Sequence, residues 1–225
     1  MHYFMIMAAF FAAAGQSPME VARDAQDRPA LQRFANEYSA AAEKASNDAE
    51  AQYRAAEANS YNAEVAIELR DKKAAEEAAE RGIKFGERAV SLKPENARYY
   101  VILGTLYGQS ISGNLLTALS YGKKAKDALQ KAVDKDSHLA IAYEARGVGN
   151  YYLPQAMGGG YDVAASDFRK AIELDPKDAQ AYLWLGLTLR KQNKNAEARQ
   201  AFQKSLELNP NRTWAKQQLD KTPAQ

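Results

Sequence analysis

The clearest hydrophobic pattern along the chain is helical, and it lies between residues 179 and 210. Tyr182, Leu185 and Leu189 recur at the three- and four-residue steps that mark one face of an α-helix. A polar run at 192–195 then predicts a turn. The helical pattern resumes after this turn and stops at Pro210, because proline cannot continue a helix. The segment therefore predicts two helices joined by a short turn.

The same unit recurs upstream with regular spacing. The distance from the end of one unit to a glycine in the next is ten residues in three places: Pro94 to Gly104, Ser137 to Gly147 and Pro176 to Gly186. A glycine has no side chain, so it lets a partner helix approach closely. A repeated helix pair cannot bury its apolar face alone, and the recurrence therefore predicts pairs that stack on one another.

These units resemble the tetratricopeptide repeat family. The family's pattern on its first helix appears at residues 100–107, which read YVILGTLY. Its small and aromatic positions on the second helix appear as Ala198 and Phe202, and again as Ala164 and Phe168. The resemblance covers roughly residues 30 to 219. It implies an all-α fold: a right-handed α-solenoid of stacked antiparallel helix pairs, with about four repeats plus capping helices.

A narrower resemblance lies in roughly residues 97–176, where the units are longer than usual. Pro154 followed by Gly158 and Gly159 is similar to a hinge in two families: the periplasmic T-component proteins of tripartite ATP-independent transporters, and the regulators of microtubule dynamics. The transporter-associated resemblance implies a periplasmic protein that binds a small ligand. From composition alone, residues 158–160 are interpreted as a flexible connector.

The ends of the repeat region carry their own signals. A helix is expected at 30–45 and another from Thr213 to Asp220, and both would cap the stack, because an end repeat otherwise exposes an apolar face. Residues 15–29 are expected to form a linker, and the polar residues 220–225 a C-terminal tail that frays.

The first fourteen residues are apolar and uncharged, and three alanines precede Gly15. This pattern predicts a signal peptide over 1–14, and hence an exported, periplasmic protein. The run is shorter than the ~20 residues that span a bilayer, and the mature chain is expected to have no membrane span. The missing Lys or Arg near the start leaves a buried N-terminal helix in a cytoplasmic protein as the alternative.

Composition argues against several function classes. The 30 basic and 28 acidic residues give a net charge of +2, which is not the clustered basic excess of nucleic-acid-binding proteins. The chain has no cysteine, and the single histidine beyond the N-terminal run, His138, falls at a predicted turn. No catalytic, phosphate-binding or metal-binding motif occurs. We therefore expect no enzyme activity, no catalytic residues, no metal and no cofactor.

The candidate site follows from the family resemblance, which implies that certain positions on the first helix of each pair line a concave surface. Tyrosine and arginine at such positions are typical binding anchors. Tyr151 and Tyr152 fit packing equally well, and Arg190 with Lys191 favours a partner that carries a carboxylate. The residues expected to contact a partner are Tyr53, Tyr61, Arg98, Glu144, Tyr151, Tyr152, Arg190 and Lys191.

The function expected from these features is a protein–protein interaction scaffold that binds a partner peptide or helix on its concave face. The alternative is a periplasmic small-ligand-binding protein associated with a transport system. A closed aromatic pocket near residues 151–161 would favour the ligand binder, whereas an open groove with exposed aromatic rings would favour the scaffold.

Overall fold

The computed structural model describes residues 16–111 and 115–224, and the described residues form helices and turns without a strand. The signal peptide expected at 1–14 lies outside them. The elements in chain order are α1 (Pro18–Asp24), α2 (Arg28–Lys44), α3 (Ala49–Glu68), α4 (Lys72–Leu92), α5 (Ala97–Gln109), α6 (Leu115–Lys135), α7 (Ala140–Tyr152), the 3-10 turn η1 (Gln155–Met157), α8 (Tyr161–Leu174), α9 (Ala179–Lys191), α10 (Asn195–Leu208) and α11 (Thr213–Asp220).

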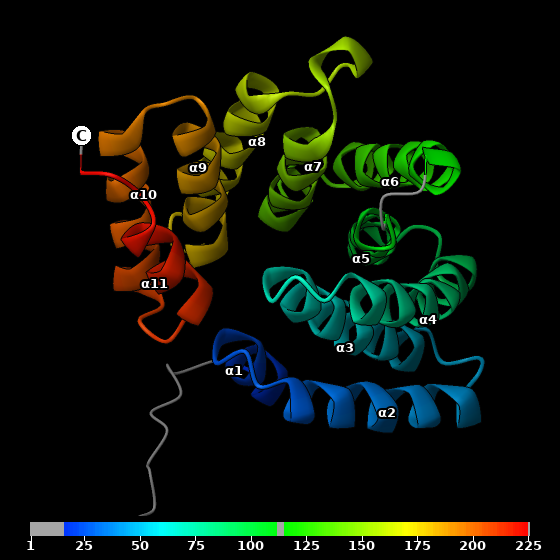
Figure 1. Ribbon diagram of the computed structural model, residues 1–225. Coiled ribbons are helices and arrows are strands. Elements are labelled where there is room, and N and C mark those ends of the chain that lie inside the picture. Colours follow the sequence, from blue (N-terminus) through cyan, green and yellow to red (C-terminus); the bar gives the residue numbers. More distant parts are fainter. Residues whose placement is uncertain (1–15, 112–114, 225) are drawn as a thin grey trace, which may run out of the picture.

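The helices pack as successive hairpins along an arc (Figure 1). The pairs are α3–α4, α5–α6, α7–α8 and α9–α10, and each pair contacts the next. Helices α4, α8 and α10 end two residues before Pro94, Pro176 and Pro210, as the sequence predicts. The expected all-α solenoid of about four repeats is confirmed.

Short polar side chains start the first helix of three pairs. Asp48, Asn96 and Asp178 each accept hydrogen bonds from backbone N–H groups in the first turn of α3, α5 and α9. These N–H groups have no partner within the helix, so a side-chain oxygen at this position stabilises the helix by ~1 kcal/mol. The caps place the start of each inner helix at the same point in successive repeats.

Close helix packing within a pair depends on the repeated glycine. A Cβ atom on Gly186 of α9 would lie 2.7 Å from Cε1 of Phe202 on α10, and Phe202 is fully buried. Gly147 on α7 meets Phe168 on α8 in the same way. The predicted role of the glycine is therefore confirmed, because the phenylalanine ring occupies the space that a side chain would need.

The N-terminal end of the solenoid differs from the expectation at one point. Helix α2 matches the expected cap, but helix α1 lies within the stretch 15–29 that was expected to be a linker. Ser17 and Glu20 form a reciprocal capping box, and Pro18 stands at the first helical position. Met19 and Ala22 are buried against α2 and α3, so this short helix belongs to the core.

The C-terminal tail also differs in part. Thr222, which was expected in a frayed tail, is buried at 2% exposure. Its hydroxyl donates to the carbonyl of Gln218 and accepts from the guanidinium of Arg190. These bonds hold the end of α11 against α9, and they explain why the polar residues after Asp220 do not all project into solvent.

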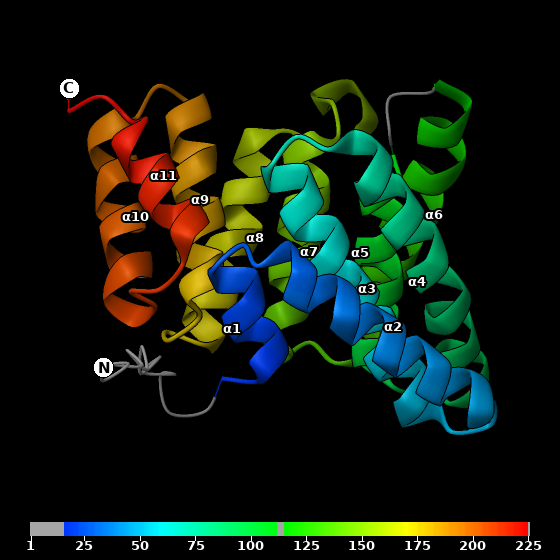
Figure 2. The ribbon, with the colours of Figure 1, turned by 60° about the horizontal axis from the view of Figure 1, so that its bottom comes forward.

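The two ends of the solenoid meet. Helix α1 lies between α2 and α11 in both views (Figures 1 and 2). Asn209, which precedes the turn into α11, donates to Asp24 of α1 at 2.6 Å across 185 residues of sequence. We call Asp24, Glu64, Glu68, Asn209 and Arg212 the end clasp, because together they join α1 and α3 to the α10–α11 turn.

Arg212 is the centre of the end clasp and is 1% exposed. Its Nη2 donates to Glu64 at 2.7 Å and also to Glu68, and its Nη1 donates to Glu68 at 3.2 Å. Its Nε lies 3.7 Å from Asp24, which is equally buried. Removing one partner of a buried ion pair leaves uncompensated charge and costs ~3–5 kcal/mol. The clasp therefore holds the two ends in one arrangement.

None of the helices in the described part of the chain is long and apolar enough to cross a bilayer.

The glycine–phenylalanine contact predicts that Gly186→Ala destabilises the fold by ~1–3 kcal/mol, the usual cost of overpacking a core. Gly108→Ala is the matched control, because a Cβ atom on Gly108 of α5 meets nothing within 4 Å. There the better helix propensity of alanine should add up to ~1 kcal/mol. Urea denaturation measures both changes. Equal stabilities for the two variants would contradict the packing argument.

Candidate partner-binding site

Helix α7 has two faces of different character. Ala142, Ala145 and Gly147 are buried against neighbouring helices. Ile141, Glu144, Val148 and Tyr152 lie elsewhere on the helix, and we call them the α7 inner face. Ile141 is 43% exposed and Tyr152 is 64% exposed. No helix in the described part of the chain covers these two side chains, although α7 lies in the middle of the repeat stack.

The α7 inner face looks toward the inside of the arc. The Glu144 carboxyl lies within electrostatic reach of Glu64 on α3, and the Tyr152 hydroxyl within reach of Glu68 on the same helix. Both glutamates belong to the end clasp. The closed ends of the solenoid therefore stand opposite the exposed side of α7, and the clasp fixes the space between them.

Five aromatic side chains meet at the C-terminal end of α7. Tyr151 lies 5.0 Å from Tyr152, 5.3 Å from Tyr161 and 5.6 Å from Trp184, measured between ring centroids. Trp214 of α11 lies 5.3 Å from Trp184. Most of these rings meet edge-to-face, which is a favoured arrangement for aromatic pairs. We call these five residues the aromatic cluster.

The aromatic cluster has a buried base and an exposed rim. Trp184 is 8% exposed and stacks on Phe168 of α8, which is fully buried. Tyr152 and Tyr161 form the rim, at 64% and 37% exposure. Burial raises the pKa of Tyr151 to about 12, so its hydroxyl stays protonated at neutral pH. The cluster is a neutral, rigid platform with two accessible rings.

A tight turn brings Tyr161 back to Tyr151. After α7 the backbone becomes extended at Leu153, passes through Pro154 and η1, and enters α8 through three glycines. Gly158 and Gly160 have φ values of 82° and 105°, a region that favours glycine. The Gly160 N–H donates to the carbonyl of Asn150 at 2.9 Å. Residues 158–160 are thus a hydrogen-bonded turn, and the interpretation as a flexible connector is corrected.

Glu144 is the acidic residue of the site whose pKa departs most clearly from its ordinary value. Burial raises the pKa of its carboxyl well above the ordinary value, and the nearby carboxylates of Asp178 and Glu64 raise it further. Arg23 and Arg212 oppose this shift without forming an ion pair with Glu144. Within residues 16–111 and 115–224, no hydrogen bond or ion pair satisfies the Glu144 carboxyl. Asp178 is already engaged as the cap of α9.

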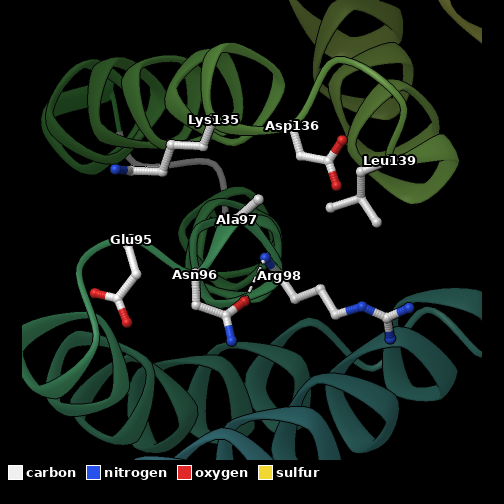
Figure 3. A pocket seen from close by; sticks show the side chains of 7 residues that line it. All are labelled: Glu95, Asn96, Ala97, Arg98, Lys135, Asp136 and Leu139. Carbon is white, nitrogen blue, oxygen red and sulfur yellow. Dashed lines mark hydrogen bonds between the residues drawn. The ribbon is translucent and has the colours of Figure 1, made fainter.

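Arg98 lies at the other end of the inner surface, where it lines a pocket of about 420 Å³ (Figure 3). Its guanidinium is exposed and has no hydrogen-bonded partner in the part of the chain that the structure describes. The pocket is also lined by Glu95, Lys135, Asp136 and Leu139. Two acidic and two basic side chains balance one another there, so the pocket has no dominant charge.

Tyr53 and Tyr61, both expected in the groove, are engaged in packing within α3 and its neighbours. Tyr53 stacks on Tyr99 at 5.3 Å, and its hydroxyl donates to Glu57 at 2.9 Å. Tyr61 packs among apolar residues of α1 and α2, and the guanidinium of Arg23 lies 5.1 Å from its ring centroid. Their part in partner binding stays a prediction.

The two basic residues at the end of α9 have separate surroundings. Arg190 donates to the backbone carbonyl and the side chain of Gln218, and its guanidinium lies 5.8 Å from the Phe202 ring centroid. It thus ties α9 to α11. Lys191 is exposed and has no ion-pair partner within the described ranges. A joint role of Arg190 and Lys191 in binding a carboxylate-bearing partner stays a prediction.

Of the eight expected residues, the structure brings Glu144, Tyr151 and Tyr152 together on α7. Sequence reasoning missed Tyr161, Trp184, Trp214 and Asp178 as neighbours of these three. Two tryptophans 30 residues apart in successive units were the available signal for the aromatic cluster. Exposed His138 lies on a turn, and no described group of three or more His, Cys, Asp or Glu residues is arranged to hold a metal ion.

Comparisons with known proteins agree with the helical pairs. A family model described as tetratricopeptide repeat matches residues 158–213. The cell division cycle protein 27 homolog of Caenorhabditis elegans is 30% identical over 99 residues, which are 44% of this chain and 12% of that protein. The chain therefore spans only a small part of that relative.

Two solved structures are similar to the chain. A thermophilic TPR protein from Thermus thermophilus has a TM-score of 0.62 at 18% identity, with 91% of this chain and 98% of that chain covered. The first TPR of Spaghetti (RPAP3), bound to the HSP90 peptide SRMEEVD, has a TM-score of 0.47 at 24% identity, with 56% of this chain and 90% of that chain covered. The likeness to the Thermus protein supports the shared fold.

The raised pKa of Glu144 predicts that Glu144→Gln increases stability at neutral pH. Between the unfolded pKa of ~4.3 and the higher folded pKa, the folded chain holds a proton that the unfolded chain has lost, so wild-type stability falls as pH rises through this window. A glutamine at position 144 does not ionise, so it does not cause this fall in stability.

Melting temperatures from pH 4 to 8 test this expectation, with Glu197→Gln on the exposed side of α10 as the control for charge removal. The advantage of Glu144→Gln should grow with pH and vanish near pH 4. A variant that melts at or below wild type at pH 7 would show that the Glu144 carboxylate is well accommodated.

Proposed function

We propose that this chain, of which residues 158–213 match the tetratricopeptide repeat family, is a protein-interaction scaffold whose α7 inner face and aromatic cluster bind a segment of a partner protein. The family match and the stacking of the helix pairs support a binding role, because stacked repeats form an extended concave surface on which partners bind. The proposed contact region runs from Ile141 to Tyr152 along α7.

The observation that carries the proposal is the exposure of Tyr152. Its ring is 64% exposed, yet it stands on a cluster whose other members are packed together. Tyrosine and tryptophan in a rigid setting are the residues that most often dominate binding energy at interfaces. Met157 and Val163, at 52% and 43% exposure, are further exposed apolar side chains in the segment that follows α7.

The end clasp makes this face preorganised. Because Arg212 joins α3 to the α10–α11 turn, the space in front of α7 is set before a partner arrives. Binding to a preformed surface avoids the ordering cost that a flexible surface would bear. If the partner segment is flexible, the entropy cost of ordering on binding falls on the partner and not on this surface.

An open platform fits a peptide better than a small apolar ligand. A small-molecule site encloses most of its ligand among apolar side chains, whereas Tyr152 and Tyr161 face solvent. The pocket at Arg98 is large enough for a small molecule, but most of the side chains that line it are charged or polar. Binding at the α7 inner face therefore takes precedence over the transporter-associated alternative.

We further propose that the protein acts by binding rather than by catalysis, and that it is exported to the periplasm. The first proposal is supported by the match of residues 158–213 to the tetratricopeptide repeat family, because stacked repeats form extended binding surfaces. The second rests on the apolar sequence of residues 1–14 alone.

Replacing Tyr152 by alanine should reduce recovery of partner proteins at least tenfold in a quantitative pull-down from the source cells, since truncating an interface hot spot costs ~2 kcal/mol or more. Leu119→Ala is the matched control, because Leu119 is 54% exposed on α6 and lies away from the proposed face. Recovery of every partner in equal amounts by wild type and Tyr152→Ala would refute the assignment.

A further inference from the structure

We propose that the partner segment is cationic, and that a lysine or arginine side chain of the partner lies against the carboxyl group of Glu144 while the neighbouring part of the segment packs on the aromatic cluster. This inference rests on the proposed function and specifies its partner chemistry. It is argued from the charges that face the α7 inner face, from the unsatisfied state of Glu144 and from the spacing along α7.

Acidic groups outnumber basic groups in front of α7. Arg212 bonds to Glu64 and Glu68 and lies near Asp24, while Arg23 pairs with Asp24 at 2.7 Å. The carboxylates in this region are Asp24, Glu64, Glu68, Glu144 and Asp178, and the guanidinium groups that oppose them are Arg23 and Arg212. The immediate surroundings of Glu144 therefore have an acidic excess, although the whole chain carries a net charge of +2.

Glu144 is the carboxyl on which this excess falls. The other four acidic groups have partners: three lie in the end clasp, and Asp178 caps α9. Glu144 has neither a hydrogen-bond partner nor an ion-pair partner within the described ranges, and it retains partial exposure toward the inside of the arc. A largely buried carboxyl without a partner is costly to ionise, and a bound cation would remove that cost.

The aromatic cluster favours the same class of partner. The face of a tyrosine or tryptophan ring carries negative potential and attracts ammonium and guanidinium groups. Tyr152 and Tyr161 are the two exposed rings of the cluster. An acidic segment would instead meet the carboxylate excess around Glu144 and be repelled. Arg190, a cation near Tyr151, is already bonded to Gln218.

The spacing along α7 limits the arrangement of the segment. Eight residues separate Glu144 from Tyr152, which corresponds to ~12 Å at ~1.5 Å per helical residue. An extended peptide advances ~3.3 Å per residue, so ~4 residues cover this distance. The inferred recognition element is a lysine or arginine followed or preceded, about four residues away, by an aromatic or large aliphatic side chain.

Selection of binders from a random peptide library by the immobilised full-length chain tests the inference without a known partner. The library is selected in parallel on wild type, Glu144→Gln, Glu197→Gln and Tyr152→Ala. Peptides recovered on wild type and on the Glu197→Gln control should be enriched in lysine and arginine. They should also carry an aromatic or large aliphatic residue about four positions from the basic residue. Glu144→Gln should lose the basic enrichment but keep the apolar preference.

One selected peptide, resynthesised, should bind Glu144→Gln about tenfold more weakly than wild type, in line with the loss of a charge-assisted contact. Peptides without basic enrichment, or with equal enrichment on Glu144→Gln, would overturn the cationic partner and leave the proposed function standing. Failure of wild type to select any peptide that Tyr152→Ala loses would overturn both.

Discussion

The buried guanidinium of Arg212 is the contact on which the arrangement of this solenoid depends. A repeat protein is held together by contacts between neighbouring repeats, and its two ends normally remain apart. Here Arg212 bonds to Glu64 and Glu68 of α3, and Asn209 bonds to Asp24 of α1. The curvature of the stack is therefore not free to vary, because opening it would separate buried charges from their partners.

The same closure produces the electrostatic character of the site. To surround Arg212, the chain brings several carboxylates to the inside of the arc, and Glu144 is left beside them without a partner of its own among the described residues. Natural sequences break local rules of charge compensation mainly where function requires it. The exposed Tyr152 ring lies two helical turns away, so the unpaired carboxyl and the exposed ring occur on the same helix.

The repeat pairs were predictable because their determinants are local. The constant distance from Pro176 to Gly186 reflects a helix end, a short turn and a capped helix start, all of which occur within one unit. The contact of Gly186 with Phe202 also lies within one pair. The closure was not predictable in this way, because it depends on small rotations that accumulate over four repeats before Arg212 reaches Glu68.

The candidate site was predictable in part for the same reason. Family positions on the first helix of a pair placed Glu144, Tyr151 and Tyr152 on one helix correctly, but they could not show that α1 covers Tyr61 or that α11 engages Arg190. Both outcomes depend on the capping helices, which lie outside the repeat pattern. The contact of Tyr151 with Tyr161 depends on the path of residues 153–160. The sequence shows the length of this segment but not the turn that it forms.

The distance between the two ends of the solenoid in solution tests the central claim most directly. The sequence contains no cysteine, so spin labels at Ala25→Cys and Lys216→Cys, both exposed positions on either side of the end clasp, report a single pair. Pulsed electron-spin measurements should give one narrow distribution when Arg212 is present, and a broader one that extends to longer distances in Arg212→Met. A broad distribution with Arg212 present, or a narrow one that Arg212→Met leaves unchanged, would contradict closure by the clasp.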